Sequence, residues 1–248
     1  MHGDEQRAEG GSERERLERL VAAQQPTGRR GRGLLLDRLC ATAVAELDLC
    51  AAAVSHPPTD GTHLVAAASD DAARRLEELQ FDVGEGPTHD ACRERRPVLV
   101  PSLDDRALQR WPGFVQAAAS VGVAAVFTFP LHVGAALLGA LALYRATAGG
   151  LSGAEVRTAL TLADLTVEAM IDLTLDDDTD APPFVDALDG QAHVYQAQGI
   201  VMVQLGVSLT EALALMRGRA HAEGLSLADL SRAIIDGTAS FGQDGTAP

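Results

Sequence analysis

The chain has 248 residues, 46% of them hydrophobic, which is enough material for one large domain or two small ones. The 35 acidic residues outnumber the 20 basic ones, and the net charge of −15 excludes a protein that coats nucleic acid non-specifically. Every one of the 20 Lys or Arg residues is Arg, which excludes a Walker lysine and Schiff-base chemistry.

The N-terminal residues 1–32 alternate Glu and Arg, with Gly, Ser and Gln between them, which predicts a solvated, disordered arm. This arm lacks the apolar run of a signal peptide. No apolar stretch in the chain reaches the ~18 residues that a membrane span requires. We therefore expect a soluble, cytoplasmic protein without membrane contact.

From residue 33 onward, short apolar runs alternate with amphipathic segments, a pattern that is typical of a folded region of helices and strands. Two apolar runs on either side of the turn at 132–134 predict a β-hairpin at the centre of a sheet. In chain order, we expect a helix at 34–47, strands at 49–55 and 63–69, a helix at 70–79 capped by Asp70, a strand at 97–100, a helix at 108–121, and strands at 123–131 and 135–144.

A longer helix is predicted over 152–174, where Ser152 and Glu155 form a capping box. Apolar residues then recur at spacings of four and three, which favours packing against the preceding domain, against a second chain, or both. The members of this stripe are Val156, Leu160, Ala163, Val167 and Met170.

Residues 176–185 are acidic and contain two prolines, which predicts a linker. Three helices are expected after it. The first covers 186–205, the second begins with a capping box at Ser208 and Glu211 and ends at Gly224, and the third begins at Ser226. Three short helices bury only a small core, so packing against another unit would stabilise them.

The sequence matches none of the enzyme motifs GxGxxG after a strand, GxSxG and HExxH, and its His residues are scattered, so we expect neither catalysis nor a metal site. The three Cys residues share no CxxC spacing. Cys92, three residues after His89, is the candidate reactive thiol, although packing is the favoured interpretation of all three. The Gly84–Pro87 turn is interpreted as backbone geometry, not as a phosphate loop.

Two groups of residues are candidates for binding. Phe81, His89, Trp111 and Phe114 are candidates for lining a small-molecule pocket, with anchoring in the core as the alternative. In the last segment every Arg lies between Arg217 and Arg232, which fits either a local RNA-facing patch or an ordinary solvated surface.

The C-terminal segments AQGIVM (197–202), SLTEAL (208–213), MR (216–217) and LSLADL (225–230) resemble the ANTAR domain. The resemblance implies a three-helix unit that binds tandem hairpins in nascent RNA, commonly as a dimer. Gln198 stands where the family usually has Lys, and Ser231 where it has Ala. The candidate RNA-binding residues are Gln198, Gly199, Met202, Arg217, Arg219, His221 and Arg232.

The segments FDVGEGP (81–87), RPVLV (96–100), RWPGF (110–114) and LGAL (138–141) resemble a GAF domain of the kind that precedes ANTAR in actinobacterial regulators. The resemblance implies an antiparallel sheet between helices and a sensor pocket, but it specifies neither ligand nor cofactor, and both are left unknown.

The sequence therefore predicts an α+β protein in which a GAF-like sensor precedes a three-helix ANTAR domain. The expected divisions are an arm at 1–32, the sensor at 33–175, the linker at 176–185, the ANTAR domain at 186–240 and a tail at 241–248. The expected function is transcription antitermination by a homodimer that binds tandem RNA hairpins in response to an unknown small-molecule or protein signal. The alternatives are a ligand-gated helical dimerisation module without RNA and a GAF thiol-redox sensor or enzyme.

Overall fold

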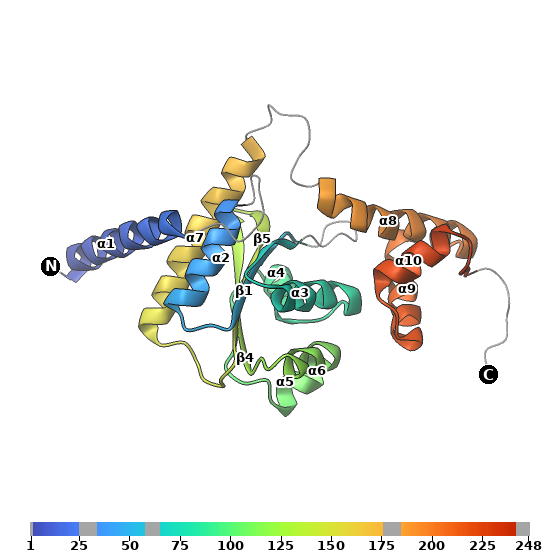
Figure 1. Cartoon of the computed structure of the whole chain (residues 1–248), viewed down its shortest axis with the longest axis horizontal. Coiled ribbons are helices and arrows are strands. Elements are labelled where there is room, and N and C mark those ends of the chain that lie inside the picture. Colours follow the sequence, from blue (N-terminus) through green and yellow to red (C-terminus); the bar gives the residue numbers. More distant parts are fainter. Residues whose placement is uncertain (1, 25–33, 58–64, 176–184, 242–248) are drawn as a thin grey trace.

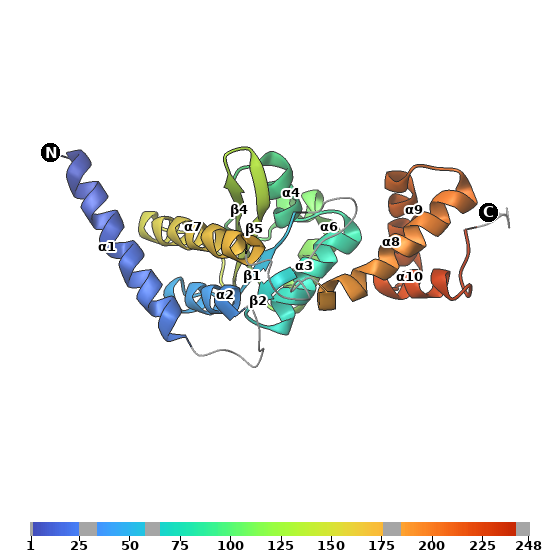
Figure 2. The same cartoon turned by 90° about the horizontal axis from the view of Figure 1, so that it is seen from above.

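The computed structural model describes residues 2–24, 34–57, 65–175 and 185–241, and it confirms the α+β class. An antiparallel sheet with helices on both faces is followed by a separate group of three helices. Figure 1 and Figure 2 both place this C-terminal group at the end of the molecule opposite the N-terminal helix. The predicted linker lies almost entirely outside the described residues.

The sheet has the order β2-β1-β5-β4-β3 in the described part of the chain, and every pairing in it is antiparallel. The β4–β5 hairpin lies at its middle, because β5 pairs with β4 on one side and with β1 on the other. The predicted central hairpin is thereby confirmed. The strands are β1 Ala51–Ser55, β2 Val65–Ala68, β3 Val98–Val100, β4 Ala125–Val133 and β5 Ala136–Arg145.

Gly139 allows β1 and β5 to meet, because a β-carbon at this position would lie 2.1 Å from the carbonyl oxygen of Ser55. We expect Gly139→Ala to disturb this pairing and to lower the free energy of unfolding by roughly 1–3 kcal/mol, the usual cost of overpacking. Urea unfolding followed by Trp111 fluorescence measures this. Gly153→Ala is the matched control, since its β-carbon would meet only Arg157 Nη1 at 3.7 Å. An unchanged midpoint for Gly139→Ala would contradict the register.

One face of the sheet is covered by α2 (Leu34–Glu46) and α7 (Gly153–Leu175), and α1 (His2–Ala23) packs against both. The sequence predicted a disordered arm here, and the structure corrects that prediction. Leu17 and Val21 of α1 are buried, while Arg14 Nη2 binds Glu168 Oε2 of α7 at 2.5 Å. The prediction of disorder rested on the high charge of the segment. The apolar residues in the last two turns of α1 are nevertheless enough to pack it onto the domain.

Helix α7 begins as predicted, with reciprocal capping bonds between Ser152 and Glu155 of 2.6 and 3.2 Å. The predicted apolar stripe is only partly inward. Leu160 is 45% exposed, whereas Ala163 and Met170 are buried. The buried face of the helix is displaced around its axis and consists of Ala159, Leu162, Ala163, Thr166, Ala169 and Met170.

The other face of the sheet carries a second core, which lies beneath four helices. Asp70 caps α3 as predicted, since its Oδ1 accepts from Ala73 N at 2.7 Å. A short helix capped by Asp104 precedes the Trp111 turn and was not predicted. The helices are α3 Asp71–Val83, α4 Pro87–Glu94, α5 Asp105–Arg110 and α6 Pro112–Ser120.

The C-terminal helices are α8 Val185–Leu205, α9 Leu209–Glu223 and α10 Leu227–Ile235, which agree with the three helices predicted. The capping box of Ser208 and Glu211 is present, and Gly224 ends α9 in the left-handed conformation with φ of 66°. Within the described ranges no single helix is long and apolar enough to span a bilayer. The α8–α9 pair passes that test only jointly, across a 103° bend.

Candidate functional site

The cationic side chains of the C-terminal helices differ in how far they are already engaged. Arg219 binds Glu223 Oε1 at 2.7 Å and the carbonyl oxygen of Ser240 at 2.8 Å, and its guanidinium lies 5.1 Å from the Phe241 ring centroid. Arg232 forms one ion pair, with Asp229 at 3.0 Å, and its side chain is 55% exposed. His221 is exposed at the end of α9. These side chains are accessible to a ligand from solvent.

The three candidate RNA-binding residues on α8 differ in their exposure to solvent. Gln198 is only 2% exposed, and its Nε2 donates to the carbonyl oxygen of Leu209 at 2.7 Å, so it joins α8 to the start of α9. Gly199 faces open space, because a β-carbon there would meet no atom within 4 Å. Met202 is half-buried against the core of the three helices. Gln198 thus has a packing contact where the resemblance implies an RNA contact.

Arg217 lies against the sensor domain. Its guanidinium carbon is 5.0 Å from the centroid of the Phe81 ring, which is a cation–π distance. Burial lowers the pKa of Arg217, and its Nε is buried without a hydrogen-bond partner among the described residues. The sequence predicts Phe81 and Arg217 in two different sites, and the structure brings them together.

The end of α3 makes two more contacts with the C-terminal helices. Phe81 is 8% exposed and belongs to the buried cluster of α8–α10, not to the core of its own domain. The Asp82 carboxylate lies near the backbone N–H of Leu227, the first residue of α10. Burial raises the pKa of Asp82 to about 6, against the lowering effect of this N–H.

The four residues predicted to line a sensor pocket are not brought together. Trp111 and Phe114 are buried in the core between the sheet and α3–α6, and Phe81 lies in the other cluster. Trp111 Nε1 donates to Asp90 Oδ2 at 3.1 Å, so this side chain anchors α5 and α6 to α4. His89 is half-buried on α4, and burial lowers its pKa. Trp111 and Phe114 therefore anchor the core of the sensor domain, which was the alternative to lining a pocket.

A buried polar cluster that sequence analysis missed lies inside the sensor domain. Its centre is Glu77 of α3, which is 0% exposed. Ser55 Oγ donates to Glu77 Oε2 at 2.7 Å, Gln80 Nε2 and Thr88 Oγ1 donate to Oε1 at 2.8 and 3.0 Å, and the Tyr144 hydroxyl donates to the same oxygen. Burial raises the pKa of Glu77 above its ordinary value.

The thiols are poorly placed for nucleophilic chemistry. Burial raises the pKa of Cys92 to about 12 and also raises the pKa values of Cys40 and Cys50. A nucleophilic thiol needs a lowered pKa and access to its substrate. Cys40 and Cys92 are buried, and the exposed Cys50 directs its Sγ to the carbonyl oxygen of Tyr144 at 3.2 Å. Cys40 and Cys92 therefore pack in the interior, as the packing interpretation predicts.

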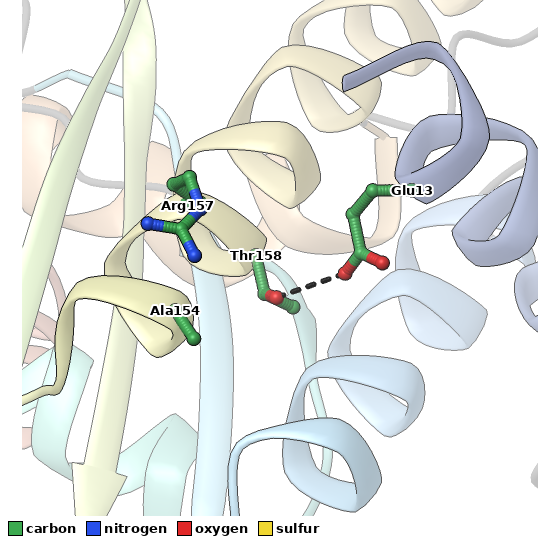
Figure 3. A pocket seen from close by; sticks show the side chains of 4 residues that line it. All are labelled: Glu13, Ala154, Arg157 and Thr158. Carbon is green, nitrogen blue, oxygen red and sulfur yellow. Dashed lines mark hydrogen bonds between the residues drawn. The ribbon is translucent and has the colours of Figure 1, made fainter. Parts of the chain in front are cut away.

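A hollow of ≈ 220 Å³ between α1 and α7 lies away from these candidates (Figure 3). Thr158 Oγ1 donates across it to Glu13 Oε1 at 3.0 Å, and Arg157 and Ala154 complete its lining. Across the described parts of the chain, no three His, Cys, Asp or Glu side chains are grouped to hold a metal ion.

Comparison with known proteins gives two family matches, the GAF domain over residues 34–170 and the ANTAR domain over residues 184–235. Among solved structures, the chain is similar to the GAF domain from an Acinetobacter phosphoenolpyruvate-protein phosphotransferase, at 10% identity and a TM-score of 0.51, over 68% of this chain and 96% of that one. The corresponding Coxiella burnetii GAF domain gives 12% identity and a TM-score of 0.50, over 68% and 97%. Comparison with curated proteins gives no match.

The chain belongs to the GAF domain family, and its C-terminal helices form an ANTAR domain. Both resemblances seen in the sequence are thereby confirmed. GAF domains are sensor domains and ANTAR domains belong to RNA-binding antitermination regulation, so the chain is built from regulatory parts. The solved structures, at identities near 10%, support the fold of the sensor alone.

Proposed function

We propose that the chain is a signal-responsive transcription antiterminator, whose ANTAR domain binds tandem hairpins in nascent RNA and prevents termination. The observation that carries this proposal is the ANTAR match over 184–235, in a segment whose every Arg lies on α9 or α10. Hairpin loops are bound through unstacked bases and a few Arg contacts, which needs a small patch and no overall positive charge.

Arg219, His221 and Arg232 are the residues that we assign to RNA contacts in the described structure. The ion pairs of Arg219 and Arg232 are exposed, and such pairs contribute only about 0–1 kcal/mol. Phosphate oxygens would therefore replace Glu223 and Asp229 at little cost. Gly199, with open space around it, permits a close approach of the RNA backbone. Gln198 is left out of this surface because its side chain is buried.

We assign the sensing role to residues 33–175, where the signal is a small molecule or a protein whose identity stays open, and the RNA-binding role to residues 186–240. Homodimerisation is part of the proposal, since two modules on one RNA raise the effective concentration of the second contact. Exposed apolar residues at the α8–α9 junction support it: Val203 is 74% exposed and Leu209 51%. Sedimentation of the full chain measures the oligomeric state.

Arg232→Ala is the direct test of the assigned surface. We expect it to weaken binding to a two-hairpin RNA and to reduce the slope of log K against log salt by about 0.7–0.9, the value for one lost phosphate contact. Fluorescence anisotropy between about 50 and 200 mM salt measures both. Arg157→Ala removes an exposed cation from α7 and is the matched control. Equal affinity and slope in both variants would rule out Arg232 as a phosphate contact.

A further inference from the structure

We propose that the sensor domain holds the ANTAR helices in a docked state, in which the end of α3 covers Arg217 and withholds it from RNA. This inference rests on the proposed function. It concerns the one Arg of the ANTAR domain that the structure places against another domain, and it gives the two domains a means of communication.

An aromatic side chain makes the central contact. Phe81 is on α3 of the sensor, yet it is buried in the cluster formed by the inward residues of α8–α10, which includes Met216 and Leu230. The guanidinium of Arg217 lies over the Phe81 ring with its carbon 5.0 Å from the ring centroid. A guanidinium held against a ring in this way has one face covered, and half-buried Arg217 is less accessible to RNA bases and phosphates than a free side chain.

A charged contact at the start of α10 adds to the aromatic one. The Asp82 carboxylate lies near the N–H of Leu227, at a helix N-terminus, where the N–H groups favour negative charge. Arg217 is also close enough to interact with this carboxylate. Asp82 therefore occupies a position that attracts anions, and it satisfies part of the positive charge that a phosphate would otherwise meet.

Gly84 lies at the close approach of the two domains. It ends α3 with φ of 73°, and a β-carbon at this position would lie 3.2 Å from Arg217 Nη1. The FDVGEGP segment thus has two uses: its glycines shape the turn between α3 and α4, and its first two residues contact the ANTAR helices. The backbone-geometry interpretation of the turn covers only the first of these uses.

The same helix connects the docking residues to the buried polar cluster. Gln80, the neighbour of Phe81, donates to Glu77 Oε1 at 2.8 Å and accepts from Thr88 N at 2.8 Å. A rearrangement of this cluster would shift the end of α3 and the Phe81 contact with it. Contacts between domains of one chain resemble transient interfaces, so release of the ANTAR helices is compatible with an intact sensor.

The test compares the wild-type full chain with two docking variants, Phe81→Ala and Asp82→Lys. The first variant removes the ring, and the second places a positive charge at the α10 N-terminus and beside Arg217. Asp164→Lys is the control with the same change of charge, because Asp164 is an exposed residue of α7 on the other face of the sheet. Hydrogen exchange without RNA measures docking, and anisotropy with a two-hairpin RNA measures binding.

We expect faster hydrogen exchange at 81–86 and 209–223 in both variants but not in the control.

The RNA affinity should rise as well. If about nine tenths of the wild-type chains are docked, release raises the apparent RNA affinity about ten-fold. Adding Arg217→Ala to Asp82→Lys should remove that gain. Unchanged exchange in both variants would overturn the docked state. Faster exchange with unchanged RNA affinity would overturn the masking of Arg217. If no form binds the RNA, both the proposed function and the masking of Arg217 are overturned. Hydrogen exchange still tests the docked state separately in that case.

Discussion

Replacing Glu77 with alanine is expected to lower the free energy of unfolding of the sensor domain by about 3–5 kcal/mol, because each of several buried donors left without an acceptor costs about 1–3 kcal/mol. The substitution leaves the Tyr144 hydroxyl, the Gln80 amide and the Thr88 hydroxyl without their common acceptor. Urea unfolding followed by Trp111 fluorescence measures the loss, because this residue is the chain's single Trp and lies in the sensor core. Glu78→Ala, one residue further along α3 and exposed, is the matched control.

Glu77→Gln separates the shape of the side chain from its charge. Burial raises the native pKa of Glu77 above the ordinary value of 4.5. Between 4.5 and the raised pKa, the native state keeps a proton that the unfolded chain has released, so this group's stabilising contribution is full below pH 4.5 and falls as pH rises. The amide does not titrate, and we expect the variant to gain stability relative to wild type over that window. A difference that is independent of pH would contradict a protonated Glu77.

Met216→Ala is expected to have the second large effect, confined to the ANTAR helices. Met216 is 0% exposed, and truncation of a buried Met costs about 2–5 kcal/mol. A core of three short helices buries little surface, so its free energy of unfolding is small. We expect helical signal in far-UV circular dichroism to be lost at a lower temperature, while Trp111 fluorescence keeps its wild-type transition.

Leu215→Ala is the matched control for this prediction, since the neighbouring side chain is 44% exposed. Its effect should stay within about 0.5 kcal/mol, as for most surface substitutions. A Met216→Ala chain in which both signals shift together would show that the two domains unfold as one unit, contrary to the separate transitions expected here.

The strands and most of the helices were predictable because their patterns are local. The β4–β5 hairpin consists of two apolar runs around a turn, and the caps at Asp70, Ser152 and Ser208 mark the starts of helices. Helix α1 was not predicted, since its burial depends on contacts with α2 and α7 that no local pattern of charged residues indicates.

The candidate sites were less predictable because they depend on contacts between distant segments. Phe81 and Arg217 are 136 positions apart, and only the packing of α3 against α9 brings them together. Glu77 did carry a usable signal. It lies on the inward face of α3 with Ala73, Leu76 and Gln80, at the spacing of one helical face, so a carboxylate at this position indicates a buried group.

The most direct test of the proposed RNA binding is to crosslink the full chain to RNA in its own cells and to sequence the RNA that is recovered with it. We expect enrichment of transcript leaders that carry two adjacent hairpins upstream of a terminator, with crosslinks on α9 and α10. Two results would contradict the proposed RNA binding. One is recovery of no RNA, and the other is recovery of RNAs simply in proportion to their abundance, without enrichment of paired hairpins.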